Sequence, residues 1–288
     1  MKTHLDCIPC FFRQGLSAAR MVTDDAEKQK GVLDAIATKI PEISADMTPP
    51  EMGITIYQAV HAASGLEDPY KSLKDHYNRL VLDLYSRLKA NVQEAKDPLL
   101  MAIRYAIAGN IIDFGPQSSF DLEQEIAASP TRPFSIFDYE NFRQALAETE
   151  EILYLGDNAG EIVFDKLLIE TMNKPTTFVV RGKPIINDAT RQDATFVGMD
   201  EVADVIDNGA GIPGTILKYC SSEFHGHYQK AKLIISKGQG NYESLSEENK
   251  PIFFMLKAKC PVVATHLNVP VGGVILKQAE MSLNNLSD

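Results

Sequence analysis

Four short apolar runs in the second half of the sequence are each followed by polar residues that could do chemistry. If these runs are parallel strands, their carboxyl ends share one edge of a sheet, where ligands of such sheets bind. The segment at 207–209 alone is equally typical of a turn, but four segments at one edge predict a shared site. The segments are Asp157-Asn158-Ala159-Gly160-Glu161, Arg181-Gly182-Lys183, Asp207-Asn208-Gly209 and Lys237-Gly238-Gln239-Gly240-Asn241.

The residue types in these segments indicate phosphate chemistry at a hard metal ion. Carboxylate and amide oxygens suit Mg²⁺ or Mn²⁺, and such an ion can polarise a phosphoryl oxygen and activate water. Lys237 and Arg181 would balance charge on the phosphate, and the glycines let the backbone approach a ligand. The sequence has no P-loop spacing, no G-x-S-x-G elbow and no G-x-G-x-x-G after a predicted strand, so the corresponding mechanisms are disfavoured.

The composition of the chain argues against two classes of binding partner. The 288 residues carry a net charge of −11, from 39 acidic and 28 basic residues, which argues against nucleic acid or an anionic membrane as the partner. No apolar run approaches the roughly 20 residues that span a bilayer, and the N-terminal residues do not resemble a signal peptide. Four cysteines fit a reducing compartment, so we expect a cytoplasmic protein.

Two parts of the sequence differ in their patterns of apolar residues. Apolar spacings of three and four predict helices over 7–21, 24–40, 49–63, from 68 onward and over 98–110. Short apolar runs at 152–155, 177–180, 202–206, 233–235, 252–256 and 274–276 alternate with helix-sized segments, which is typical of parallel sheets covered on both faces. We therefore predict a helical domain over 1–96 and an α/β domain over 97–288, with a connector around 129–133.

Five motifs together resemble the DUF89 family of metal-dependent damage-control phosphatases, and most closely its prokaryotic branch with an N-terminal CxxC. They occur in the family's order and cover nearly the whole chain. They are Cys7-Ile8-Pro9-Cys10, Ala108-Gly109-Asn110-Ile111-Ile112-Asp113, Asp157-Asn158-Ala159-Gly160-Glu161, Pro184-Ile185-Ile186-Asn187-Asp188-Ala189-Thr190 and Lys237-Gly238-Gln239-Gly240-Asn241-Tyr242-Glu243.

The resemblance implies a helical N-terminal domain on a Rossmann-like three-layer α/β/α domain with a mainly parallel sheet. It implies a divalent metal (Mn, Mg, Co or Ni) held by Asp157, Asn158 and Asp188, and only the resemblance selects Asp188 over Asp193. Lys237 matches the phosphate-binding lysine of the family and completes the catalytic set. The residues expected around the substrate or its phosphate are Asn110, Asp113, Glu161, Arg181, Gly238 and Asn241.

The favoured function is hydrolysis of a phosphate monoester of a small metabolite, a sugar phosphate or a damaged phospho-metabolite, by metal-activated water. Asp157 or a neighbouring carboxylate would be the base, and direct attack by an aspartate stays open. A second hypothesis is a non-enzymatic metal- or metabolite-binding regulator that uses the same cleft. A third and weaker one is a sugar- or nucleotide-binding protein without hydrolysis. The sequence does not decide the substrate, the preferred metal or the oligomeric state.

Cys7 and Cys10 form half of a zinc site or a redox pair. A structural or inert role is favoured, because no second CxxC exists. His225 and His227 are expected in a surface loop. The residues that could complete a zinc site, if the fold brought them close, are Cys220, Cys260, His4, His225 and His227.

Overall fold

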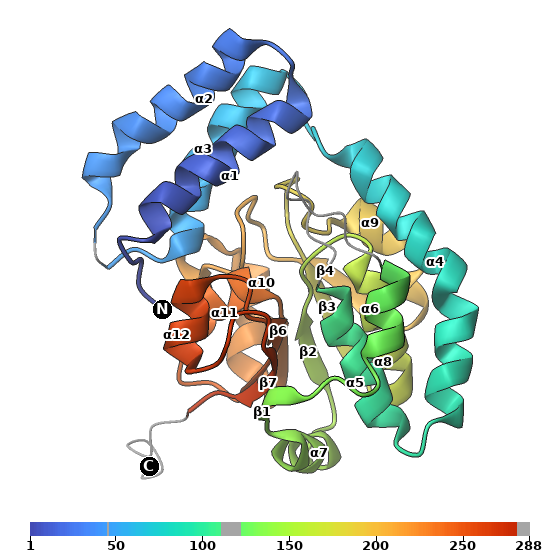
Figure 1. Ribbon diagram of the computed structural model, residues 1–288. Helices are drawn as coiled ribbons and strands as arrows, with labels where there is room; N and C mark the ends of the chain where they lie inside the picture. The colour runs from blue at the N-terminus through green and yellow to red at the C-terminus, as the bar shows by residue number, and fades with distance from the viewer. Residues whose placement is uncertain (45, 111–121, 281–288) are drawn as a thin grey trace.

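A seven-stranded sheet forms the centre of the larger part of the protein, with the strand order β1-β7-β6-β5-β2-β3-β4 (Figure 1). The computed structural model describes residues 1–44, 46–110 and 122–280. Every pair of neighbouring strands is parallel except β6 and β7. The strands are β1 (Phe134–Phe137), β2 (Ile152–Leu155), β3 (Thr176–Val180), β4 (Asp204–Asp207), β5 (Ile234–Lys237), β6 (Ile252–Lys257) and β7 (Val274–Gln278).

Helices cover both faces of this sheet. Successive strand residues point to opposite faces, so Tyr154 packs in one hydrophobic core while Leu153 and Leu155 pack in the other. The first core includes residues of α4 (Lys71–Glu94), α5 (Pro98–Gly109), α6 (Leu122–Ala128), α7 (Tyr139–Glu148), α8 (Glu161–Met172) and α9 (Arg191–Phe196). The second includes residues of α10 (Ser222–Lys230), α11 (Gln239–Leu245) and α12 (Pro261–Leu267). The predicted three-layer α/β/α architecture with a mainly parallel sheet is confirmed.

Three N-terminal helices form a separate group beside the sheet (Figure 1). They are α1 (Cys7–Val22), α2 (Ala26–Lys39) and α3 (Pro49–Ser64). Local sequence defines where two of them begin: the Asp25 carboxylate accepts from the first-turn amides of α2, and Thr48 and Glu51 form a capping box at α3. Phe11, Ile36 and Ile56 pack in the small core between the three helices.

Helix α4 runs from this group along the sheet (Figure 1). Its first turn contacts the small core, where Tyr70 is buried. Val81, Leu88 and Val92, farther along α4, belong to the large core that includes α5 and α8. The predicted division after residue 96 stays a prediction, and this packing adds that most of the apolar stripe of α4 faces the α/β layer rather than α1–α3.

The predicted strands all form, and most of their ends shift by one or two residues. Strand β1 was missed: its four residues alternate between exposed and partly buried, and β7 is its only partner in the described sheet, so its sequence lacks a buried-strand signal. His225 and His227 lie on α10, so their placement in a loop was wrong. Short 3₁₀ turns occur at Ile40–Glu42, Met199–Glu201 and Leu217–Tyr219. None of the described helices has the length and hydrophobicity of a membrane span.

The packing of α4 predicts the effect of shortening a core residue. Leu88 is fully buried, and Leu88→Ala should reduce the free energy of unfolding by about 2–5 kcal/mol, the usual range for such a cavity. Leu66→Ala, at a side chain that is 57% exposed, should change it by less than about 0.5 kcal/mol. Urea unfolding followed by circular dichroism would measure both, and equal effects would contradict the assignment of α4 to the large core.

Candidate active site

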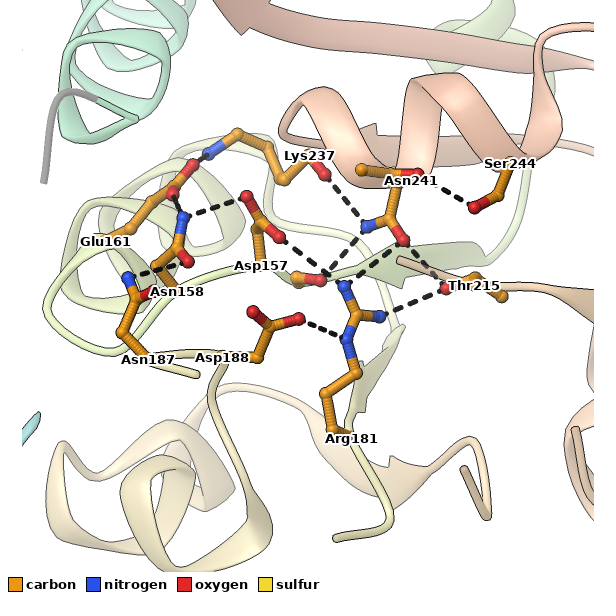
Figure 2. A network of polar contacts seen from close by, with 12 residues as sticks. Asp157, Asn158, Glu161, Arg181, Asn187, Asp188, Thr215, Lys237, Asn241 and Ser244 are labelled. Carbon is orange, nitrogen blue, oxygen red and sulfur yellow. Dashed lines mark hydrogen bonds and ion pairs between the residues drawn. The ribbon is translucent and has the colours of Figure 1, made fainter. Parts of the chain in front are cut away.

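The polar ends of strands β2, β3 and β5 meet in one buried network (Figure 2). Asp157 follows β2, Arg181 follows β3, and Lys237 is the last residue of β5. Because β3, β2 and β5 are adjacent and parallel, their carboxyl ends lie side by side. The sequence prediction of a shared site at this sheet edge agrees with this arrangement. In the ion pairs of Arg181 and Lys237, no side chain is more than 11% exposed.

Arg181 lies between two carboxylates that otherwise repel each other. Its Nε donates to Asp188 Oδ2 at 2.6 Å, and its Nη2 donates to Asp157 Oδ1 at 3.4 Å. Burial, together with the charges of Asp188 and Glu161, raises the pKa of Asp157 well above its ordinary value. Burial also raises the pKa of Asp188, although Arg181 opposes that shift. One guanidinium therefore compensates the two carboxylates only in part.

Amide side chains occupy the other side of the carboxylates. Asn158 Nδ2 donates to Asp157 Oδ2 at 2.8 Å and to Glu161 Oε2 at 2.9 Å. Asn110, at the end of α5, donates more weakly to the same two carboxylates, at 3.3–3.4 Å. Asn158 Oδ1 accepts from Asn187 Nδ2 at 2.8 Å. These bonds fix the orientation of the amides, because a carboxylate can only accept when it is ionised.

Lys237 is enclosed by acceptors. Its Nζ donates to Ala106 O at 2.8 Å, Glu161 Oε1 at 3.0 Å and Asp165 Oδ1 at 2.5 Å, and no part of the side chain is exposed. Burial alone would lower the pKa of Lys237, but Asp165 and Glu161 outweigh burial and hold it above its ordinary value. All three ammonium hydrogens are used, so a direct contact with phosphate requires that one of these bonds be exchanged.

Gly238 and Asn241 at the start of α11 support Asp157 and Arg181. Gly238 has φ +79°, and a Cβ at this position would lie 1.8 Å from Asp157 Oδ2, so the close approach of the two segments requires glycine. Asn241 Oδ1 accepts from Arg181 Nη2 at 3.3 Å and from Thr215 Oγ1 at 2.8 Å. The guanidinium is thereby oriented from the side opposite to the carboxylates.

The loop that carries Asp188 is held by backbone bonds and by the helical group. Ala159 N donates to Asn187 O, and Ala189 N donates to Asp157 O, both at 2.8 Å. Ile186 has φ +44°, a left-handed conformation that costs a β-branched residue of order 1–3 kcal/mol. Ile185 is buried in the core of α1–α3, and Ile186 packs against it. The N-terminal helices thus stabilise a strained turn next to the site.

The structure brings most of the predicted residues together. Asn110, Asp157, Asn158, Glu161, Arg181, Asp188, Lys237, Gly238 and Asn241 all belong to the network. Asp113 lies outside the described residues. Lys183 is exposed. Gly209 N donates to Asp207 Oδ1 at 2.9 Å, so the segment at 207–209 forms a turn.

Sequence reasoning missed several members of the site. Asp165 binds Lys237 and accepts from Tyr154 Oη at 2.7 Å; a charged residue within the otherwise apolar run of α8 was the available signal. Thr215 donates to Asn241 from a loop that carries no strong pattern. Lys259, just after β6, lies close enough for its charge to lower the pKa of Asp157, and its backbone N–H donates to Gln239 Oε1 at 2.9 Å.

The donor set fits a hard divalent cation. The network contains the carboxylates of Asp157, Glu161, Asp165 and Asp188 against the charges of Arg181 and Lys237, so carboxylates are in excess even when the charge of Lys259 that acts on Asp157 is counted. All available donors are oxygens, as Mg²⁺ and Mn²⁺ prefer. Among the described residues, no three His, Cys, Asp or Glu side chains are arranged as a metal cluster, and an amide oxygen is a further suitable ligand. Asn158 Oδ1 keeps a second lone pair beside its bond from Asn187.

A hollow of about 850 Å³ elsewhere on the surface is a weaker candidate site. It is lined by Lys89 of α4, Glu170 of α8 and Lys174 after α8, among others. Lys89 and Glu170 form an ion pair there, and Lys174 donates to the carbonyl oxygen of Thr149 at 2.8 Å. The hollow therefore lacks the excess of carboxylates that the sheet edge has.

The CxxC cysteines lie on α1, close enough to Cys260 for the charges of these thiols to act on one another. Cys7 is buried in the core of α1–α3, and burial raises the pKa of its thiol. Cys10 Sγ accepts from Arg13 and Gln14 of its own helix at 3.5 Å. All four cysteines are unpaired, and the part of the chain that the structure describes contains no thiol metal cluster. These observations favour a packing role for Cys7.

Comparison with known proteins points to one family. The model of the damage-control phosphatase ARMT1-like domain matches residues 3–275. A damage-control phosphatase of Pyrococcus horikoshii is 35% identical over 98% of this chain and 100% of its own, and an uncharacterised protein of Methanocaldococcus jannaschii is 37% identical over 96% of both. The crystal structure of a DUF89 family protein from P. horikoshii superposes with a TM-score of 0.88 at 32% identity, over 97% of this chain and 100% of that one.

The position of Arg181 predicts how stability depends on its charge. Arg181→Met leaves Asp157 and Asp188 without their cation and should reduce the free energy of unfolding of the metal-free protein at pH 7.5 by about 3–5 kcal/mol. The loss should shrink as the pH falls, because protonated carboxyls no longer need a cation. Urea titrations at pH 7.5 and pH 5 would measure this.

Arg143→Met is the matched control, since that side chain is 56% exposed, pairs with the exposed Glu140 of its own helix and otherwise lies over the Tyr139 ring. It should have little effect at either pH. A loss for Arg181→Met that is independent of pH would contradict the electrostatic explanation and indicate lost packing instead.

Proposed function

Because the chain belongs to the family of damage-control phosphatase ARMT1-like domains, we propose that it is a phosphatase that hydrolyses a phosphate monoester of a small metabolite with the help of a divalent metal ion. The named damage-control phosphatases of P. horikoshii and Archaeoglobus fulgidus, at 35% and 33% identity, support the phosphatase role. The substrate class we propose is a sugar phosphate or a damaged phosphorylated metabolite.

The main observation in support of this proposal is the excess of buried carboxylates at the sheet edge. Asp157 is nearly buried, and its pKa is raised by burial and by two neighbouring carboxylates. Such an arrangement costs stability in the absence of a ligand. A protein that only folded around this edge would gain from replacing one of the carboxylates, whereas a divalent cation would compensate their excess of negative charge.

Asp157 and Asp188 would hold the metal through carboxylate oxygens, and Asn158 through its amide oxygen. When bound, such a cation polarises a phosphoryl oxygen and lowers the pKa of a coordinated water. Mn²⁺, Mg²⁺, Co²⁺ and Ni²⁺ are all compatible with oxygen donors, with Mg²⁺ and Mn²⁺ the best matched. Glu161 and Arg181 remain to orient the ligands, because each contacts one or both of the two aspartates or Asn158.

We propose that Lys259 supplies a positive charge for the phosphate. Arg181 and Lys237 are fully enclosed in the network, whereas Lys259 is only partly buried. Its charge also reaches Asp157, so an incoming anion would meet Lys259 at the surface of the site. Lys237 would then act mainly by holding Glu161.

A screen of purified protein tests the function. Turnover of p-nitrophenyl phosphate, sugar phosphates, nucleotides and phosphorylated cofactors should be measured with each of the four metals and with a chelator. Phosphate release that depends on a divalent metal is the expected result. Metal binding without turnover of any of these substrates would favour the alternative of a metal- or metabolite-binding regulator.

Substitution of the proposed ligands should separate metal chemistry from folding. Asp157→Asn and Asp188→Asn keep the shape of the side chain but remove its charge, so metal-stimulated kcat should fall by at least a hundredfold, on the order of the loss of a ligand or its oriented partner. Asp207→Asn is the control: Asp207 ends the neighbouring strand β4 but lies in a turn. Wild-type turnover in either ligand variant would refute the assignment.

The roles of the two lysines can be told apart by kinetics. Lys259→Met should lower kcat/KM by about tenfold to a thousandfold, the scale of one lost charged contact, with little change in metal affinity. Lys237→Met should first lower stability, because it leaves Glu161 and Asp165 buried without their cation. The exposed Lys183→Met is the control. A well-folded Lys237→Met with a raised KM, beside a normal Lys259→Met, would reverse the two roles.

A further inference from the structure

Asn78, a fully buried residue of α4, contacts the loop of Asp157 and Asn158 and the helix α9 that follows the loop of Asp188. Its Oδ1 accepts from Gly160 N at 2.6 Å, and its Nδ2 donates to Asp193 Oδ1 at 3.1 Å. Gly160 lies two residues after Asn158, in the loop from β2 to α8. Asp193 lies in the first turn of α9, five residues after Asp188. One side chain from a distant helix thus connects the two halves of the site.

The orientation of the Asn78 amide is fixed by its partners. A backbone N–H can only donate, so Gly160 requires the amide oxygen, and the ionised carboxylate of Asp193 requires the amide nitrogen. A reversed amide would place donor against donor at Gly160 and acceptor against acceptor at Asp193 in a buried environment, at the cost of both hydrogen bonds. Asn78 is therefore a directed link and not a nonspecific polar contact.

Asp193 extends the link to the loop of Asp188. Its Oδ2 accepts from Thr190 N at 2.9 Å and from Thr190 Oγ1 at 2.7 Å. Lys74, one helical turn before Asn78 and only 2% exposed, pairs with Asp193 at 3.1 Å and with Asp68 at 2.7 Å. The charge of Asp193 is compensated here, so this carboxylate is a structural group and does not compete for the metal.

We propose that Asn78 is a positioning residue that sets the spacing between the loop of Asp157 and Asn158 and the loop of Asp188, and thereby the affinity for the divalent cation. The proposal rests on the metal-dependent function above. Hydrogen-bond partners one step removed from a metal hold its ligands in place, and their loss typically weakens metal binding by about 10–100-fold. Asn78 acts one bond further out, on the backbone and the helix cap that carry the ligands.

The decisive measurement is metal affinity, determined directly on the purified full chain. Mn²⁺ binding followed by electron paramagnetic resonance should show a Kd raised about tenfold or more in Asn78→Ala, with kcat largely restored at saturating Mn²⁺. Amide hydrogen exchange in the metal-free protein should be faster around Gly160, which has lost its acceptor. A merely structural role would lower the melting temperature and leave the Kd unchanged, which would overturn the proposal.

Asn91→Ala is the matched control, because Asn91 lies on the same helix and donates to Tyr105 Oη at 3.1 Å. It should leave the Mn²⁺ Kd at the wild-type value. A rise in Kd equal to that of Asn78→Ala would overturn the proposal, since any disturbance of α4 would then suffice.

Asp193→Asn tests the second half of the link and serves if Asn78→Ala does not fold. The new amide keeps its oxygen toward the three donors of Thr190 and Lys74, so its nitrogen faces the amide nitrogen of Asn78 and the bond between Asn78 and residue 193 is lost. The Mn²⁺ Kd should rise while the Gly160 amide stays protected; an unchanged Kd would overturn the proposal. A wild-type chain that binds no Mn²⁺ would overturn both this proposal and the metal-dependent function, whereas a normal Kd in Asn78→Ala beside lost binding in Asp157→Asn would overturn this one alone.

Discussion

The repulsion between carboxylates at one edge of the sheet is the constraint on which the rest of the site depends. Asp157, Asp188 and Glu161 lie together in a nearly water-free environment, where like charges interact far more strongly than in water. The surrounding residues serve to hold them there. Arg181 binds both Asp157 and Asp188, and Lys237 pairs with Glu161 and Asp165. The protein maintains this arrangement at a cost in stability that ligand binding would relieve.

Elements far apart in the sequence hold the loops of the site in place. Parallel strands bring the ends of β2, β3 and β5 together, but they do not fix the loops that follow. The helical group α1–α3 packs on the strained turn at Ile186, and α4 reaches the loop at Gly160 through Asn78. The N-terminal helices therefore help to hold the loops of the site in place.

The polar residues at the sheet edge can be predicted from the sequence because the end of a strand is visible in a few consecutive residues. A buried apolar run followed by Asp, Arg or Lys beside glycine shows where each polar residue must lie. The family motif was needed to select Asp188, which follows no strand directly. Asn78 and Thr215 could not be predicted in this way, since each lies in a helix or loop whose local pattern is ordinary, and only the tertiary contacts bring them to the network. Strand β1 was missed for a similar reason, because an exposed edge strand lacks the apolar run.

The choice of amides around the carboxylates is consistent with a site built for a cation. Asn110 and Asn158 donate hydrogen bonds to the carboxylates, and Asn187 orients Asn158. An amide satisfies a buried acceptor without changing its charge, whereas a lysine or arginine in its place would satisfy the acceptor and cancel the charge as well. Arg181 and Lys237 are the cations that pair directly with these carboxylates, and the amides of Asn110 and Asn158 supply further donors without charge. That distribution keeps the carboxylates ordered and hydrogen-bonded while it preserves the negative charge that a divalent ion would require, so we expect added cations at the amide positions to improve folding at the expense of metal binding.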